Sequence, residues 1–310
     1  MKKFLKPAGI FIIVMLIPLF TPVITDAEES STTLFLRATQ YEQQGDYEQA
    51  IALYKRILTK ENSATVTLKM YELELKRENN AVAETVITKA YSDYPDNSQV
   101  SFYYGLFLTN QAEAYEKGSA DYKRYYAEAT KAFQNALRVE PTERFYVAVA
   151  VASQAAGNYT LTENTYKQLI EKLDMPEYYR AIGLLKLEQG KRAEAIKDLE
   201  KAITLSDDLQ AYLILAELYL KDDKVTKAME YLGKVAELRP DLASPNQYLG
   251  EYYQGTGDYE KAIHYYRQAA EGSTEPGNKA AFLRTIGALA LDKEIYQTAY
   301  EAFSEALTIT

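Results

Sequence analysis

The residue types that most often carry chemistry are scarce in this chain of 310 residues, which contains no cysteine and one histidine, His264. Without cysteine there is no thiol nucleophile, no disulfide and no thiolate ligand for a metal. A single imidazole leaves a histidine-rich metal cluster or a serine-type triad with almost nothing to build on. We therefore expect no enzymatic activity, no metal and no cofactor, and we expect His264 on the surface.

Three short motifs resemble sites but are better explained as turns. Gly255-Thr256-Gly257 matches half of a phosphate-binding loop, but no strand precedes it and no Gly-Lys-Ser/Thr follows it. The acidic pairs Asp207-Asp208 and Asp222-Asp223 lack the spacing of an EF-hand loop, and aspartate is favoured in turns because its side chain hydrogen-bonds locally. Weak calcium binding is the alternative for these pairs.

The charge of the chain excludes one class of partner. It has 35 basic and 44 acidic residues and a formal net charge of -9, with the two signs interleaved along the sequence. A protein that binds nucleic acid needs clustered lysine and arginine facing the phosphates. We therefore expect no nucleic acid as a partner. Hydrophobic residues make up 47% of the chain, which is ordinary for an ordered protein.

The first 27 residues have the pattern of a secretory signal. Three lysines within the first six residues precede an apolar run over residues 8–20, and small residues follow up to Ala27. The run is shorter than the roughly 20 residues that a membrane-spanning helix needs. We expect a signal peptide over residues 1–27, cleaved after Ala27. The alternative is an uncleaved membrane anchor kinked at Pro18; both export the remainder to the periplasm, the cell envelope or the medium.

The remainder is built from repeats. The hexamer at residues 45–50, Gly-Asp-Tyr-Glu-Gln-Ala, returns almost unchanged at residues 257–262. Its turn position recurs every 33 or 34 residues, from Gly157 through Gly190 and Asp223 to the second hexamer. A period in this range is typical of a stacked solenoid.

Each unit has the pattern of a helical hairpin. Apolar residues spaced by three and four form one stripe per helix, and small residues such as Gly183, Ala195, Gly250 and Ala262 occur where two helices would approach closely. We expect a single domain over residues 28–310. Its units begin near Ser31, Ala64, Ser98, Glu143, Pro176, Leu209, Ala243 and Ala280.

In this alignment the chain resembles the tetratricopeptide repeat (TPR) family. The sixth unit, for example, has the matching residues Tyr212, Leu215, Ala216, Tyr219, Ala228, Leu232 and Pro240. The resemblance covers residue 31 to the end and implies an all-α fold: a right-handed α-solenoid of antiparallel helix pairs, the TPR superhelix. Of the 28 tyrosines, eight fall on repeat packing positions and many others form doublets whose first ring lies near the rim, so we interpret the tyrosines as packing residues and not as a cofactor or sugar site. The eight are Tyr41, Tyr47, Tyr54, Tyr212, Tyr219, Tyr253, Tyr259 and Tyr266.

The resemblance also implies a concave groove lined by the first helix of each unit. The middle of this groove is apolar and its C-terminal end is polar, which suits an extended segment or an amphipathic helix of a partner protein. The alternative is that these side chains pack on one another. The expected groove residues are Phe102, Leu106, Val147, Val151, Gln154, Arg180, Leu184, Leu187, Leu213, Glu217, Leu220, Gln247, Glu251 and Gln254.

Two features depart from the family pattern. The basic and asparagine groups of the family's carboxylate clamp are missing from the first units, so chaperone C-terminal peptides are not expected ligands. The third unit has about 12 extra residues around 112–123. We expect this insertion to lengthen both helices into a finger that carries Tyr115, Tyr122 and Tyr125. It is either a tolerated insertion or a docking element.

Together these patterns predict a non-catalytic scaffold or adaptor that is exported and binds another protein or peptide in its groove. One alternative is a protein that captures peptide or polysaccharide during export or cell-surface assembly. Another is a structural spacer that self-associates, because no polar helix covers the last repeat, which ends at Thr310.

Overall fold

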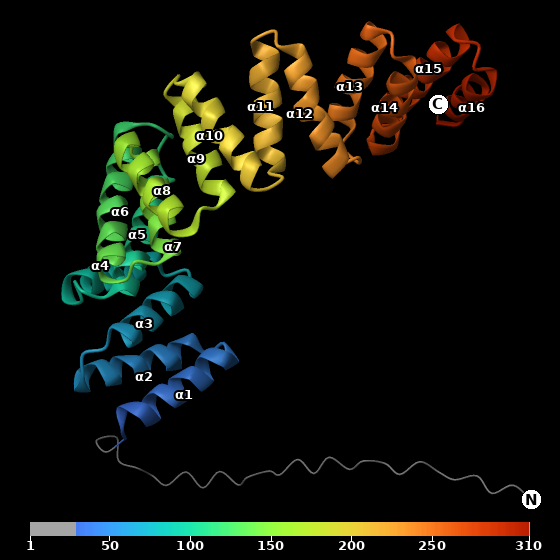
Figure 1. The fold of residues 1–310 in the computed structure, drawn as a ribbon. Coiled ribbons are helices and arrows are strands. Elements are labelled where there is room, and N and C mark those ends of the chain that lie inside the picture. The colour runs from blue at the N-terminus through green and yellow to red at the C-terminus, as the bar shows by residue number, and fades with distance from the viewer. Residues whose placement is uncertain (1–28, 310) are drawn as a thin grey trace, which may run out of the picture. The chain divides into compact units, whose positions relative to one another are not determined.

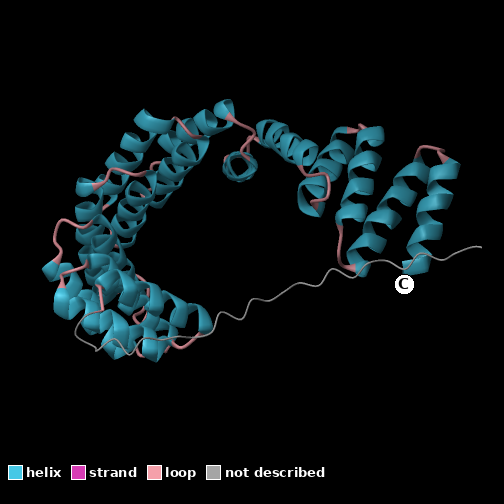
Figure 2. Ribbon diagram, turned by 90° about the horizontal axis from the view of Figure 1, so that it is seen from below, coloured by secondary structure: helices cyan, strands magenta, loops and turns pink. Residues whose placement is uncertain are grey.

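The computed structural model describes residues 29–309, which form α-helices joined by short loops, with no strand among them (Figure 2). The all-α prediction is confirmed. The expected signal peptide, like its alternative as an anchor, lies outside the described residues. Between residues 29 and 309, no helix has both the length and the apolar character needed to cross a membrane.

The helices belong to two compact units, residues 1–100 and 101–310, each described by itself. The first unit contains α1 (Ser31–Gln44), α2 (Tyr47–Lys60), α3 (Ala64–Lys76) and α4 (Asn80–Asp93) (Figure 1). The second unit, which begins within α5, contains α5 (Ser98–Ala112), α6 (Ala120–Val139), α7 (Glu143–Ala155), α8 (Tyr159–Leu173), α9 (Pro176–Glu188), α10 (Arg192–Leu205), α11 (Leu209–Lys221), α12 (Val225–Leu238), α13 (Ala243–Thr256), α14 (Tyr259–Gly272), α15 (Pro276–Asp292) and α16 (Tyr296–Ile309).

The odd-numbered helices from α1 to α13 begin at the residues from which the units were aligned, Ser31 to Ala243. The last of them, α15, begins at Pro276, four residues before the expected Ala280. Proline is favoured in the first turn of a helix, because its fixed φ suits the helix and the first N–H groups have no intrahelical partner. The expectation of a single domain stays a prediction.

The repeated hexamer forms the turn inside a hairpin. Gly45 and Gly257 end α1 and α13 in the left-handed conformation, with φ of 79° and 83°, which glycine adopts without strain. The aspartate that follows caps the next helix: Asp46 Oδ1 accepts a hydrogen bond from the Gln49 N–H at 3.2 Å. Asp223, at a turn position without glycine, also has a positive φ, 56°.

The predicted close helix contacts are present. Ala195 and Ala262 are fully buried. A Cβ on Gly250 would lie 2.8 Å from Cδ1 of Tyr266, and one on Gly183 would lie 2.9 Å from Cγ of Leu199. A larger side chain at these glycines therefore requires the two helices of the hairpin to move apart.

Tyrosines serve the packing between hairpins, as the sequence predicted, and one group also makes a polar network. The Glu200 carboxylate on α10 accepts hydrogen bonds from Tyr219 Oη at 3.0 Å and from Tyr231 Oη at 3.2 Å. It also accepts one from Lys227 Nζ at 3.0 Å. The Lys227 ammonium lies over the ring of Tyr219, 4.3 Å from its centroid. Three successive helices, α10 to α12, are therefore joined through one carboxylate.

This network should make stability depend on pH through Glu200. Burial alone would raise the pKa of Glu200, but the hydrogen bonds from Lys227, Tyr219 and Tyr231 outweigh it and lower that pKa. A carboxylate whose pKa is lowered by folding stabilises the folded state above its unfolded pKa, and this contribution is lost as pH falls through the folded pKa. Urea unfolding should show Glu200→Gln to be less stable than the original chain near pH 7, with the difference shrinking towards about pH 3.

Glu230→Gln is the matched control for that experiment, because Glu230 is exposed on the neighbouring α12. The free energy of unfolding of Glu230→Gln should stay close to that of the original chain at every pH. If the loss of unfolding free energy in Glu200→Gln is the same at every pH, the charge of the Glu200 carboxylate does not contribute to stability.

Candidate functional site

The predicted groove residues all lie in the second unit, on the first helices of its hairpins, and they differ in exposure. The exposed ones are Leu106, Val151, Leu184, Glu217, Glu251 and Gln254. The half-buried ones are Val147, Gln154, Arg180, Leu187, Leu213, Leu220 and Gln247. Phe102 alone among them is buried.

Phe102 is a core residue, which corrects its expected place in the groove. Its ring centroid lies 5.5 Å from that of Phe133 on α6 and 5.2 Å from that of Phe145 on α7. The Arg144 guanidinium covers the ring at 3.9 Å from its centroid. With a helix on each side and a cation above it, this ring is not available to a partner.

Three aliphatic side chains form an exposed set that we call the aliphatic column: Leu106, Val151 and Leu184. They occupy the ninth position of three successive units, on α5, α7 and α9, and are 40%, 51% and 40% exposed. The ninth position of the next two units is occupied by Glu217 and Glu251, both exposed. The apolar middle and polar end expected of the groove are thus both on the surface.

A hydrogen bond shows that α7 and α9 are neighbours on this face. Gln154 Nε2 donates to Glu188 Oε1 at 2.9 Å. Val151 lies three residues before Gln154 on α7, and Leu184 lies four residues before Glu188 on α9, so each shares a helix face with its polar neighbour. Val151 and Leu184 therefore line adjacent ridges of one surface.

The Arg180 side chain is engaged in a contact within the protein. It forms an ion pair with Asp208, whose side chain is 6% exposed. Asp208 also caps α11, where its Oδ1 accepts a hydrogen bond from the Ala211 N–H at 3.0 Å. From the sequence, Asp208 was interpreted only as a turn residue. The structure shows that it also links its hairpin to the preceding one, through Arg180 on α9, 28 residues earlier.

The finger, residues 112–123, consists of the last residue of α5, a loop over residues 113–119 and the first four residues of α6. We expected the insertion to lengthen both helices; α6 has 20 residues and α5 has 15, compared with 13 in the first helices α7, α9 and α11. Ser119 Oγ caps α6 by accepting from the Tyr122 N–H at 3.2 Å. The Tyr115 ring stacks on that of Tyr125 with centroids 5.5 Å apart. The finger is therefore held by caps and ring contacts.

Between the finger and the end of α7 lies a cavity of about 660 Å³, which we call the finger pocket. Its volume is in the range of ligand-binding sites. The pocket includes Val151 of the aliphatic column, so it is continuous with that surface. Its lining residues are Lys117, Gly118, Tyr122, Lys123, Tyr126, Val151, Gln154, Ala155, Gly157, Tyr159 and Glu188.

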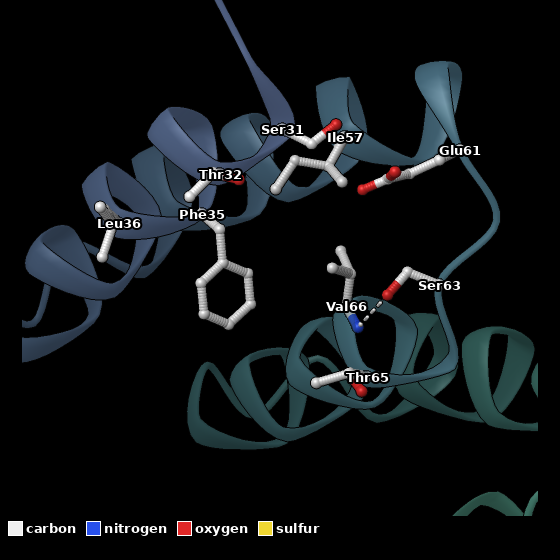
Figure 3. A pocket seen from close by; sticks show the side chains of 9 residues that line it. All are labelled: Ser31, Thr32, Phe35, Leu36, Ile57, Glu61, Ser63, Thr65 and Val66. Atoms are coloured by element: carbon white, nitrogen blue, oxygen red, sulfur yellow. Dashed lines mark hydrogen bonds between the residues drawn. The ribbon is translucent and has the colours of Figure 1, made fainter.

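The first unit has a smaller pocket of about 320 Å³ (Figure 3). Figure 3 shows Phe35, Ile57 and Val66 around one space, with the Ser63 hydroxyl bound to the Val66 N–H. Its walls also include Ser31, Thr32 and Thr65, so hydroxyl groups surround an apolar floor. Among residues 29–309, Glu61 is the one charged residue that lines this pocket.

Within residues 29–309 there is no group of three or more His, Cys, Asp or Glu side chains that could hold a metal ion. His264 is exposed, as expected, and its ring lies 5.1 Å from that of Tyr265. The two pockets and the aliphatic column can contact a ligand through apolar side chains, hydrogen bonds and charged groups.

Stacked helical hairpins with exposed first helices define a helical-repeat scaffold, a fold used for protein interactions. Tetratricopeptide repeat models match residues 32–61, 180–243 and 249–310. The chain belongs to the tetratricopeptide repeat family.

Several proteins are similar in sequence to parts of this chain. The TPR repeat-containing protein YpiA of Bacillus subtilis is 26% identical over 148 residues, 46% of this chain and 32% of that protein. The protein CTR9 homolog of Arabidopsis thaliana is 28% identical over 132 residues, 42% of this chain and 12% of that protein. The chain thus spans a third or less of the length of these relatives.

Among solved structures, the C-terminal part of a TPR repeat-containing protein from Cytophaga hutchinsonii superposes with a TM-score of 0.58 and 19% identity. The match covers 79% of this chain and 97% of that one. At this identity the likeness shows the fold alone.

Proposed function

We propose that this protein is a non-catalytic scaffold that is exported and binds an extended segment of a partner protein on the aliphatic column. The observation that carries the proposal is the exposure of Leu106, Val151 and Leu184 at one repeat position of three successive hairpins. Isolated exposed aliphatic residues are common on protein surfaces, but a set aligned along adjacent helices offers a partner a row of apolar contacts.

The polar surroundings favour a peptide over a purely apolar ligand. Gln154 and Glu188 lie beside the column, and Glu217 and Glu251 continue its line. An extended backbone has N–H and C=O groups that need partners, and amide and carboxylate side chains can supply them. A partner segment with aliphatic side chains at intervals would place these in the column and its backbone against the polar groups.

Export is supported by the amino-terminal sequence, with its three lysines, apolar run and small residues before Glu28. Under this proposal, the partner is a protein of the periplasm, the cell envelope or the medium. Capture of a polysaccharide is the second candidate ligand class, for which the exposed rings of Tyr159 and Tyr248 provide surface.

The test is a selection from a random peptide library displayed on phage, with the full chain as bait. The enriched peptides should contain aliphatic residues, and Leu184→Glu should weaken their binding about tenfold or more, because it brings a carboxylate against an apolar anchor. The matched control is Leu173→Glu on α8. Leu173 is 41% exposed, close to the 40% of Leu184, and lies outside the column, so its replacement should leave binding unchanged.

Equal loss of binding in both leucine variants would contradict a specific groove. A library that yields no enriched peptide, followed by binding of the same chain on a glycan array, would favour polysaccharide capture.

Self-association stays a prediction, and one surface favours it. Tyr296, Tyr300 and Leu307 on α16 are 64%, 71% and 77% exposed. On α14 the corresponding Tyr259 and Ile263 pack into the cluster formed with α15. The uncovered face of α16 is the place where a second copy would pack if the chain forms a spacer.

A further inference from the structure

The finger pocket has a chemistry that the aliphatic column does not explain. Two of its lining residues, Lys117 and Lys123, form no ion pair with any described residue. Their neighbour Arg124, by contrast, pairs with Asp121 at 3.1 Å and with Glu128 at 3.3 Å. Uncompensated cations in a chain of net charge -9 mark a place where an anion is favoured.

The acids around the pocket are already engaged or lie outside its lining. Glu113 accepts a hydrogen bond from Tyr126 Oη at 2.8 Å, and it does not line the pocket. Glu116 is exposed and also outside the lining. The one lining carboxylate is Glu188, which accepts the hydrogen bond from Gln154 on α7. The two lysines therefore leave the pocket with an excess of positive charge.

The pocket also has the contacts that a peptide side chain needs. Tyr122 and Tyr126 form one wall, with ring centroids 4.7 Å apart. Burial and the hydrogen bond to Glu113 raise the pKa of Tyr126, so its hydroxyl stays protonated while its oxygen can still accept a bond. Val151 belongs both to this pocket and to the aliphatic column.

We infer that the finger is a specificity element which selects partner segments carrying an acidic side chain next to an aliphatic one. The aliphatic residue covers Val151, and the aspartate or glutamate beside it reaches Lys117 and Lys123. This inference rests on the proposed function, because it assigns part of the same partner segment. The occupant is a protein segment, since the cationic pocket is continuous with the apolar column.

The experiment uses the peptides enriched from the random library on the full chain. They should share an aspartate or glutamate at a constant distance from an aliphatic residue. Replacing that acid by its amide should weaken binding about tenfold, as should the double variant Lys117→Glu/Lys123→Glu. The two losses should not add, because both remove the same ion pair. Binding of the acidic peptide should weaken at higher salt.

The double variant Lys131→Glu/Lys197→Glu is the control, with the same change of charge. Both of its lysines are exposed, on α6 and α10, and neither lines the pocket. It should leave the affinity within about twofold of the original.

The outcomes separate this inference from the proposed function. If Leu184→Glu abolishes binding but the amide peptide and the Lys117/Lys123 variant bind as before, the inference is overturned and the groove stands. If both lysine pairs weaken binding equally, a general charge effect replaces the finger site. Enriched peptides without an acid also overturn the inference, and a library without any enriched peptide overturns both.

Discussion

Replacing Phe145 by alanine is expected to lower the free energy of unfolding by about 3–5 kcal/mol, the usual cost of removing a buried aromatic ring. Phe145 is 1% exposed and contacts Phe102 of α5 at a centroid distance of 5.2 Å. It belongs to a cluster that also includes Phe133 of α6. The loss should appear as a lower midpoint of urea unfolding, followed by circular dichroism.

Because repeat arrays unfold in parts, the location of the effect is as informative as its size. Hydrogen exchange should accelerate first in α5 to α7 and much less in α15 and α16. The control is Tyr248→Ala, since Tyr248 is also aromatic but is 50% exposed. Equal destabilisation by the two variants would mean that the three phenylalanines are not the core of this hairpin stack.

The second large effect is expected from Ala262→Leu, at about 1–3 kcal/mol of destabilisation by overpacking. Ala262 is fully buried and lies in a cluster with Leu283 and Ile286 of the next hairpin. A leucine at this position has no space unless α13, α14 and α15 move apart. Thermal unfolding measures the change.

Ala193→Leu makes the same substitution at an exposed position of α10 and should change the unfolding midpoint little. If Ala262→Leu also leaves the midpoint unchanged, α14 is not held against its neighbours by small residues, and the physical explanation of the repeated hexamer is wrong.

The local part of the fold could be predicted because it depends on neighbours in sequence. The left-handed turn at Gly45 and the capping bond of Asp46 need only residues within one hexamer. The burial of Ala262 follows from the helical period, since its position repeats that of Ala50. The left-handed turn recurs in the weaker copies at Gly157, Gly190 and Asp223. The capping bond recurs at Asp258 but is missing where lysine replaces the aspartate, at Lys191 and Lys224.

The site was predicted less well, because exposure depends on side chains far along the chain. Phe102 and Val147 occupy the same repeat position, yet Phe102 is buried and Val147 is half-buried. The larger ring reaches Phe133 and Phe145 and is covered by Arg144, and the repeat pattern contains none of these contacts. Arg180 was likewise expected in the groove, but its partner is Asp208 of the following hairpin.

The sequence by itself determined that this protein is a stack of helical hairpins, because helix periodicity and turn glycines are properties of short segments. Only the tertiary structure decided which groove positions reach the surface and that the finger encloses a pocket with Lys117, Lys123 and Val151. These residues come from separate helices and loops. Their common environment exists only after the hairpins have packed.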